Sequence, residues 1–311
     1  MTLQAPITCV TGGTGFIGSA VTRRLIDDGH RVRVLSRRDT IRDERAEHCR
    51  GSLDDAESLQ RFLSGGSLLV HIAGETRDEG LMWDVNVMGT RRLVDAARQA
   101  GIRRMCHMST SIVTGPAGDV LLTEEAECRP VTPYQRSKWA AEMDVINGMG
   151  DCRLTVLRPT HVVGPSRPGP FVYPARGSWL DRLRILVNGA ACAHVISIVD
   201  VVDAAVFLIG SAKPSPVCYI ISCDEDPMNT FSGLWTLYLA ARRGAYPLPQ
   251  APVAHLPLRA SRLAQRLRGR NSLHPGQRYS SRRLRHTGFA FSHGVAGAAR
   301  LVAACGQWVC P

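Results

Sequence analysis

The sequence is poor in lysine and, over its last 85 residues, has no acidic residue at all. Only two of its 38 basic residues are lysines. Residues 227–311 contain 12 arginines and neither aspartate nor glutamate, so this segment carries a charge of +12. Residues 1–226 hold 26 basic and 27 acidic residues and are nearly neutral. Such a surplus bears on solubility and on anionic partners, and it does not determine the fold.

Long apolar runs and metal-ligand spacings are also lacking. No apolar run reaches the ~18–20 residues that span a membrane, and 196–209 is broken by Asp200 and Asp203. The first residues lack the basic start and cleavage site of a secretory signal, so we expect a cytoplasmic protein. The ten cysteines include no Cys-x-x-Cys pair, which favours reduced thiols and no bound metal.

What the sequence does contain is an alternation of apolar strands and amphipathic helices over its first 160 residues. Near-continuous apolar strands that alternate with helices are typical of a parallel sheet covered on both faces. We therefore predict an α/β fold, a Rossmann-type doubly wound parallel sheet with a smaller C-terminal lobe. The expected strands are 7–11, 31–36, 68–73, 105–109, 154–158 and 217–222.

After Pro165 the sequence becomes rich in proline, glycine and arginine and loses its clear periodicity. We expect residues 1–165 to form a nucleotide-binding domain, to which 196–222 return. Residues 166–195 and 223–311 are expected to form a smaller substrate-binding lobe.

A glycine-rich turn follows the first expected strand. In the segment Thr11–Gly18, Gly12 permits the tight turn, Gly15 lets the backbone approach a pyrophosphate, and Gly18 allows close packing of helix on strand. Its position between strand and helix predicts dinucleotide binding.

The end of the second strand indicates which dinucleotide is bound. Ser36 stands where NAD-binding sites carry a carboxylate, and Arg37 and Arg38 follow it. A hydroxyl with guanidinium groups suits a 2′-phosphate, which a carboxylate would repel. We predict NADP, with NAD as the alternative.

Tyr134 and Lys138 are spaced i, i+4 and so share one face of an expected helix. A free tyrosine with a pKa near 10 is a poor base at neutral pH, and a nearby ammonium favours its phenolate. A lysine in so arginine-rich a chain indicates a need that arginine does not meet.

Together these motifs resemble the extended short-chain dehydrogenase/reductase superfamily, in its NAD(P)-dependent epimerase/dehydratase branch. The resemblance extends from residue 5 to about 225. Its further motifs are 71–74, 86–90, 108–115, 158–165, 199–204 and 219–222.

The resemblance implies roles for individual residues. Tyr134 would be the acid/base, Lys138 would lower its pKa and bind the nicotinamide ribose, and Thr110, or else Ser111, would polarise the substrate oxygen. His161 would either touch substrate or be structural, and Glu124 is expected to be a solvated loop carboxylate rather than a second acid/base. The other cofactor contacts implied are Thr14, Phe16, Ile17, Leu53, Ala73, Gly74, Ser109, Pro159 and Thr160.

The implied function is an oxidoreductase or isomerase that acts at a carbinol or carbonyl, as a homodimer. One interpretation is a nucleotide-sugar epimerase, dehydratase or ketoreductase. However, Ala193 stands where such enzymes carry a diphosphate-binding arginine, with His194 beside it. The alternatives are a reductase or dehydrogenase of a lipid, steroid-like or secondary-metabolite carbonyl, and a non-catalytic NADP-binding regulator. The basic C-terminal segment indicates an anionic small molecule before a membrane surface, and nucleic acid is not expected.

Overall fold

The computed structural model describes residues 6–211, 218–245, 249, 253–267 and 274–305. The chain divides into two compact units. The first consists of residues 1–113, 130–158 and 202–219, and the second of 114–129, 159–201 and 220–311. Residues 114–129, which the sequence-based division gave to the nucleotide-binding domain, fall in the second unit because their strand β6 (Leu121–Leu122) pairs with β11 (Arg278–Tyr279).

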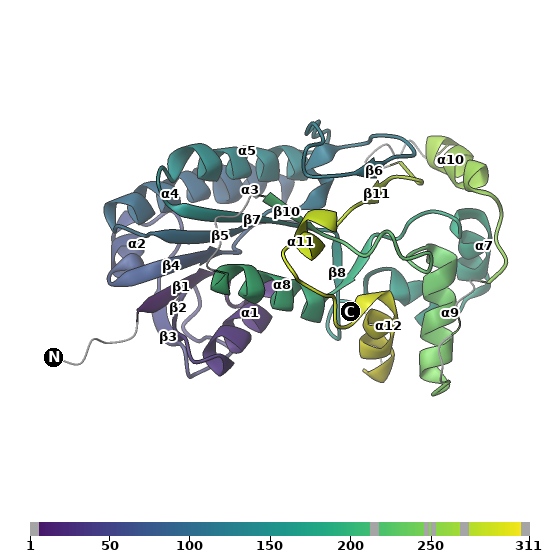
Figure 1. The fold of residues 1–311 in the computed structure, drawn as a ribbon, viewed down its shortest axis with the longest axis horizontal. Coiled ribbons are helices and arrows are strands. Elements are labelled where there is room, and N and C mark those ends of the chain that lie inside the picture. The colour runs from purple at the N-terminus through teal and green to yellow at the C-terminus, as the bar shows by residue number, and fades with distance from the viewer. Residues whose placement is uncertain (1–5, 212–217, 246–248, 250–252, 268–273, 306–311) are drawn as a thin grey trace. The chain divides into compact units, whose positions relative to one another are not determined.

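A seven-stranded sheet with the order β10-β7-β5-β4-β1-β2-β3 forms the centre of the fold (Figure 1). Its paired strands run parallel, for example β1 with both β2 and β4. Both faces carry helices, with α4 and α5 on one and α1 and α8 on the other. This confirms the predicted doubly wound Rossmann-type sheet. The strands are β1 (Ile7–Thr11), β2 (Arg31–Ser36), β3 (Glu47–Arg50), β4 (Gly66–His71), β5 (Arg104–Met108), β7 (Arg153–Pro159) and β10 (Cys218–Ile221).

Local sequence signals explain where the helices begin. Asp55 caps α2 by accepting hydrogen bonds from two backbone N–H groups of the first turn. α5 begins with a capping box between Thr132 and Gln135 and has Pro133 in its first turn, where a missing N–H costs nothing. The helices up to α5 are α1 (Phe16–Asp27), α2 (Ala56–Leu63), α3 (Glu79–Met82), the π-helix η1 (Trp83–Met88), α4 (Gly89–Gln99), the 3₁₀ helix η2 (Ser111–Thr114) and α5 (Pro133–Gly148).

The remaining elements lie in the second unit, except that α8 and β10 contribute residues to both. The parallel pair β8 (His161–Val163) and β9 (Val195–Ser197) forms a separate small sheet. The helices are η3 (Gly169–Phe171), α6 (Val172–Arg176), α7 (Trp179–Asn188), α8 (Ile198–Gly210), α9 (Phe231–Arg242), α10 (Leu258–Leu267), α11 (Arg282–His286) and α12 (Gly294–Ala304). Within the described ranges, no helix is both long and apolar enough to cross a membrane.

Apolar packing fixes the helices of one face of the large sheet. Leu59, Phe62 and Leu63 of α2 and Leu93 of α4 are buried in one cluster with Leu69 of β4. The carboxyl ends of the parallel strands then present their following loops at one edge of the sheet, where open α/β folds bind ligands.

Candidate active site

The turn after β1 is built on glycines at positions where an added side chain would clash with the backbone. Gly12 has a left-handed φ of +72°, and a Cβ added there would lie 2.6 Å from the backbone N of Ala73. A Cβ on Gly18 would lie 2.0 Å from the carbonyl oxygen of Gly12. The backbone N–H of Gly15 donates to that oxygen at 2.9 Å. The turn is therefore compact enough for the start of α1 to receive a ligand directly against its backbone.

The N-terminus of α1 is not capped by a side chain of its own N-cap residue, Gly15. Uncapped first-turn N–H groups favour an external anionic acceptor. Thr14, Phe16 and Ile17 are half-buried around this turn. These features fit a dinucleotide pyrophosphate.

Replacing Gly12 should show how much of this fit is due to packing. We expect Gly12→Ala to lower the free energy of unfolding by about 2 kcal/mol more than Gly29→Ala and to abolish NADPH binding. Gly29 also has a left-handed φ, +87°, but nothing lies within 4 Å of an added Cβ. Urea unfolding and fluorescence titration with NADPH measure both quantities. Equal effects of the two variants would mean that the contact with Ala73 is unimportant.

At the end of β2, Ser36 is buried and its hydroxyl accepts a hydrogen bond from the backbone N–H of Arg38 at 3.1 Å. Arg37 and Arg38 are exposed. The strand therefore ends with a buried hydroxyl and two solvent-accessible arginines.

Lys138 lies inside the first unit, one helical turn after the half-buried Tyr134 on α5. Its Nζ donates to the carbonyl oxygen of Met108 at 2.7 Å. Burial lowers the pKa of Lys138 to about 8, against the opposing effect of the Glu142 carboxylate. A Cβ added to Gly74 would lie 3.9 Å from this Nζ. The lysine thus joins α5 to the end of β5 and lies near the loop that follows β4.

Asn86 fixes the loop after β4 against α5. Its Nδ2 donates to the carbonyl oxygen of Glu75 and to Ser137 Oγ, both at 3.0 Å, and its Oδ1 accepts from the backbone N–H of Glu75 at 2.7 Å. Since Ser137 precedes Lys138, these hydrogen bonds fix the loop after β4 against the turn of α5 that carries the lysine.

Ser109, Thr110 and Ser111 follow β5 and are buried. The Ser109 hydroxyl donates to Glu142 Oε2 at 2.5 Å, and Thr110 leads into the 3₁₀ helix that Ser111 begins. Tertiary structure therefore brings Ser109 to a carboxylate on α5, a partner that the sequence motif did not indicate.

The ion pair between Glu142 and Arg158 was missed from the sequence. Arg158 Nη2 lies 2.6 Å from Glu142 Oε1, and the two side chains are 5% and 0% exposed. Arg158 also stacks over the ring of Trp139, with its guanidinium carbon 5.5 Å from the ring centre. The one sequence signal that Glu142 belongs to this site was its spacing four residues after Lys138, which places both side chains on one face of α5.

Two histidines are buried in the same unit, His71 in β4 and His107 in β5, with ring centres 5.1 Å apart. Burial, with a smaller effect of the Lys138 charge, lowers the pKa of His71 to about 3. Burial likewise lowers the pKa of His107 well below its usual value. Both rings are therefore neutral at physiological pH and do not compete with Lys138 as cations.

The remaining residues that the sequence predicted to contact cofactor or substrate are divided between the two units. Leu53 is half-buried against the helix start at Gly89, and the backbone N–H of Ala73 donates to Thr11 Oγ1 at 3.3 Å. Pro159, Thr160 and His161 belong to the second unit. There the backbone N–H of Thr160 donates to the carbonyl oxygen of Ile221 at 3.1 Å. The backbone N–H of His161 donates to the carbonyl oxygen of His194 at 2.7 Å.

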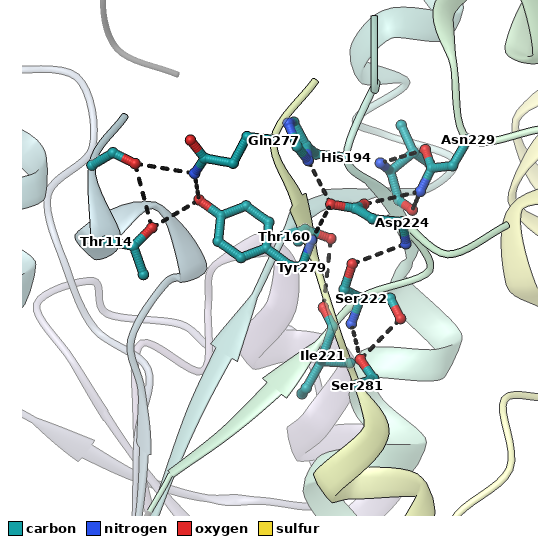
Figure 2. Close-up of polar contacts among 12 residues, drawn as sticks. Thr114, Thr160, His194, Ile221, Ser222, Asp224, Asn229, Gln277, Tyr279 and Ser281 are labelled. Atoms are coloured by element: carbon teal, nitrogen blue, oxygen red, sulfur yellow. Dashed lines mark hydrogen bonds and ion pairs between the residues drawn. The ribbon is translucent and has the colours of Figure 1, made fainter. Parts of the chain in front are cut away.

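The second unit contains a buried polar network around Asp224, which Figure 2 shows. His194 Nδ1 lies 2.6 Å from Asp224 Oδ2, which also accepts the backbone N–H of Tyr279 at 3.1 Å. Asn229 Nδ2 donates to Asp224 Oδ1 at 3.2 Å. The carboxylate is thus bonded at both oxygens.

The positive charge of His194 is balanced by the adjacent Asp224 carboxylate. Burial alone would lower its pKa, yet the adjacent Asp224 carboxylate outweighs burial and raises the pKa of His194 to about 10. Its neighbour Ala193 is buried. Among the described residues, Cys192, His194 and Asp224 also bring potential metal-ligand atoms within 4.8 Å of one another, a grouping that sequence spacing did not reveal.

This pair should make stability depend on pH. Because the folded pKa of His194 is raised, the stabilisation is complete below about pH 6.5 and is lost as the pH rises through about 10. We expect the difference in unfolding free energy between the unmodified protein and His194→Gln to shrink over that range. Urea unfolding at several pH values measures it. A difference that stays constant would contradict a charged His194.

The sequence suggested that Glu124 is a solvated loop carboxylate, and this expectation is wrong. Its side chain is 2% exposed, and Oε1 accepts the backbone N–H of Ile220 at 2.8 Å. Arg283 lies 3.7 Å from its other oxygen. Glu124 thus fastens the loop before α5 to the end of β10.

The fold and the glycine turn after β1 define a dinucleotide-binding protein of the Rossmann type. A family model described as the NAD dependent epimerase/dehydratase family matches residues 8–221. The chain belongs to this family, as its motifs indicated.

Comparison with individual proteins gives the same family and several activities. The chain is 34% identical over 170 residues to sterol demethylase protein B of Methylococcus capsulatus. This match covers 51% of the present chain and 52% of that protein. It is 28% identical to a 4-hydroxy-2-methyl-3-oxo-4-farnesyl-3,4-dihydroquinoline-1-oxide ketoreductase of Stigmatella aurantiaca, over 84% of this chain and 79% of that one. The structure of UDP-glucose 4-epimerase from Thermotoga maritima with UDP-glucose is similar in fold, with a TM-score of 0.73, 22% identity, and coverage of 96% and 98%.

Coverage of the relatives is uneven. In the first four curated relatives, the match spans 45–54% of their own length, about half. The activities of these whole proteins therefore reach the present chain only as proposals.

Proposed function

We propose that this protein is an NADP-dependent ketoreductase or dehydrogenase that acts on a carbonyl of a lipid, steroid-like or other apolar secondary metabolite. The observation that carries the catalytic part is the buried Lys138 ammonium, anchored on Met108 one helical turn from Tyr134. This is an environment in which a tyrosine serves as a proton donor and acceptor near neutral pH.

In the proposed mechanism Tyr134 exchanges a proton with the substrate oxygen. With a pKa of about 8, Lys138 is mostly protonated at pH 7, and its charge favours the phenolate of Tyr134. The Thr110 hydroxyl, with Ser111 as the alternative, donates a hydrogen bond to the same oxygen and polarises the carbonyl. When bound, the nicotinamide supplies or accepts the hydride at its C4. On reduction, Tyr134 gives its proton to the oxygen and becomes the phenolate that Lys138 stabilises.

The cofactor is proposed to lie on the glycine turn of Gly12, Gly15 and Gly18, with Ser36, Arg37 and Arg38 around a 2′-phosphate. The first-turn N–H groups of α1 would donate hydrogen bonds to the pyrophosphate oxygens. Lys138 and Tyr134 would hold the nicotinamide ribose. The other proposed contacts are those named from the family resemblance: Thr14, Phe16, Ile17, Leu53, Ala73, Gly74, Ser109, Pro159 and Thr160.

The preference for NADP gives a direct prediction. We expect Arg37→Gln/Arg38→Gln to weaken NADPH binding about tenfold or more and to leave NADH binding unchanged, because only NADPH carries the 2′-phosphate. Arg31→Gln, at the other and exposed end of β2, is the matched control. Fluorescence titration with each cofactor measures the affinities. Equal losses for NADH and NADPH would contradict the proposed 2′-phosphate site.

Two facts support an apolar substrate over a nucleotide sugar. At the place where the family resemblance implies a diphosphate-binding arginine, Ala193 is buried and the charge of His194 is taken up by Asp224. Relatives with lipid-like substrates in their names include the farnesyl quinoline ketoreductase and a ceramide reductase from Caulobacter vibrioides, 29% identical over 74% of this chain. Ser111 and His161 are the residues proposed to face the substrate.

A nucleotide-sugar epimerase is the second candidate. The chain is 30% identical to UDP-glucose 4-epimerase of Mycolicibacterium smegmatis over 66% of its own length and 74% of that protein. The two functions differ in whether cofactor is consumed, because an epimerase recycles it.

The test is a panel of apolar ketones and UDP-, dTDP- and GDP-sugars with NADPH, followed by absorbance at the nicotinamide band and by product analysis. Net NADPH oxidation with an apolar ketone supports the proposal. Sugar conversion without net oxidation would replace it with the epimerase. Turnover of neither, with tight NADPH binding, would favour the non-catalytic regulator.

We also propose that the protein is a cytoplasmic homodimer. The cysteines that the structure describes are all free, in keeping with a reducing compartment. Leu81 and Trp83, at the junction of α3 and η1, are about half exposed and offer an apolar surface for a second copy. Light scattering on the purified protein measures the oligomeric state.

A further inference from the structure

Helix α7 turns an apolar face outward. Its Asp181 and Ile185 are buried, whereas Trp179 is 72% and Leu183 49% exposed. Leu186 continues the exposed face, since positions i, i+4 and i+7 lie on one side of a helix. An amphipathic helix normally buries this side, so the exposed stripe needs an explanation.

A second exposed apolar stripe lies on the neighbouring helix α10. Leu263 is 59% and Leu267 80% exposed, again four residues apart, and Leu256 precedes the helix with 42% exposure. The two segments are bonded together within the second unit. The backbone N–H of Leu256 donates to the carbonyl oxygen of Leu186 at 2.8 Å, and Ser261 Oγ donates to that of Val187 at 3.0 Å. Figure 1 labels both helices.

Arginines flank both stripes. Arg182 is exposed, three residues after Trp179 and four before Leu186. Arg259 is also exposed, three residues after Leu256 and four before Leu263. Each apolar stripe therefore has an arginine on its own side of the helix.

The carboxylates near these helices are already paired. Asp181 is buried and bonded to Arg176 and Arg184 at 3.1 and 3.0 Å. Asp119 pairs with Arg262 of α10 and with His274. The segment that contains α10, residues 227–311, has no acidic residue. Arg182 and Arg259 therefore add positive charge to a surface whose neighbouring carboxylates, Asp181 and Asp119, are each paired with arginine.

We propose that the α7–α10 surface, formed by Trp179, Arg182, Leu183, Leu186, Leu256, Arg259, Leu263 and Leu267, docks on the surface of an anionic lipid bilayer. Leucine, tryptophan and arginine on one side of a helix are the composition of helices that lie in the membrane interface. Positive charge without acidic residues complements a uniformly anionic surface, whereas a protein partner usually presents both signs. A nucleic acid would leave the leucine stripes without a partner. The inference holds whichever carbonyl compound is the substrate.

Co-sedimentation of the full chain with vesicles tests this surface. We expect binding to vesicles of phosphatidylcholine with phosphatidylglycerol, weak binding to phosphatidylcholine alone, and a loss of binding as salt is raised. Trp179→Ser/Leu183→Ser should lower the partition coefficient at least tenfold. Arg182→Gln/Arg259→Gln should lower it about tenfold on the anionic vesicles alone.

The matched control is Val120→Ser/Leu121→Ser, which removes two exposed apolar side chains at the start of β6 in the same unit, one just before the strand and one in it. It should bind vesicles like the unmodified protein. Circular dichroism melting confirms that each variant is folded, and NADPH titration should be unchanged in all of them.

The proposal is overturned if the protein does not bind anionic vesicles, or if the control variant loses binding as much as Trp179→Ser/Leu183→Ser. It is also overturned if light scattering shows that Trp179→Ser/Leu183→Ser dissociates an oligomer, since the surface would then bind a second copy of the chain. Failure of the ketone panel with intact vesicle binding would affect the proposed function alone.

Discussion

Replacing Tyr134 by phenylalanine should lower kcat/KM about 10³–10⁴-fold but weaken NADPH binding by no more than about tenfold, because its hydroxyl is one of several proposed contacts with the cofactor. The variant keeps the ring and loses only the hydroxyl that, in the proposed mechanism, exchanges the proton with the substrate oxygen. Lys138 would remain anchored on Met108, because that hydrogen bond does not involve Tyr134. Steady-state kinetics with the best substrate of the panel and fluorescence titration measure the two quantities.

The control for this prediction is Tyr173→Phe, which removes a tyrosine hydroxyl from α6 in the second unit. Its kcat/KM should change less than about threefold. If Tyr134→Phe kept full activity, Tyr134 would not be the acid/base, and the enzyme mechanism proposed above would be wrong. If it lost NADPH binding as well as activity, its role would be to hold the cofactor.

Replacing Arg158 by methionine should lower the free energy of unfolding by about 3–5 kcal/mol. Methionine preserves most of the apolar stem, but it leaves the carboxylate of Glu142 without its cation in a site where that side chain is 0% exposed. The cost is that of a buried carboxylate that loses its ion-pair partner rather than of lost apolar packing. Urea unfolding followed by circular dichroism measures it.

A double variant separates the charge from the packing. Arg158→Met/Glu142→Gln removes both charges, so it should recover at least about 1 kcal/mol relative to Arg158→Met alone. The Ser109 hydroxyl can still donate to the glutamine side-chain oxygen. If the double variant were as unstable as the sum of the two single variants, the ion pair would contribute nothing to stability.

The sheet and its ligand-binding end could be predicted because their signals are local. An apolar strand followed by Gly12 and Gly18 specifies its own turn, since only glycine accommodates the left-handed φ of Gly12 and the close approach at Gly18. The spacing of Tyr134 and Lys138 likewise follows from helix geometry alone. The short strand β3 (Glu47–Arg50) was not predicted, because its charged ends hide the apolar pattern of a strand.

Partners distant in sequence could not be predicted. Glu124 looked like a loop carboxylate, and the contact that buries it comes from Ile220, 96 residues away. Asp224 reaches Tyr279 in the same way, across a separation of 55 residues. Neither pairing leaves a periodic or local trace in the chain.

The sequence by itself thus determined the parallel sheet, the glycine turn, the tyrosine and lysine on one helix face, and the basic C-terminal segment. Each depends on local backbone geometry or on composition. Only the tertiary structure decided that Lys138 is buried on Met108, that Asp224 neutralises His194, and that the leucines of α7 and α10 face outward. Burial and charge pairing depend on which segments pack together, and this in turn sets the pKa of a lysine and the exposure of a helix face.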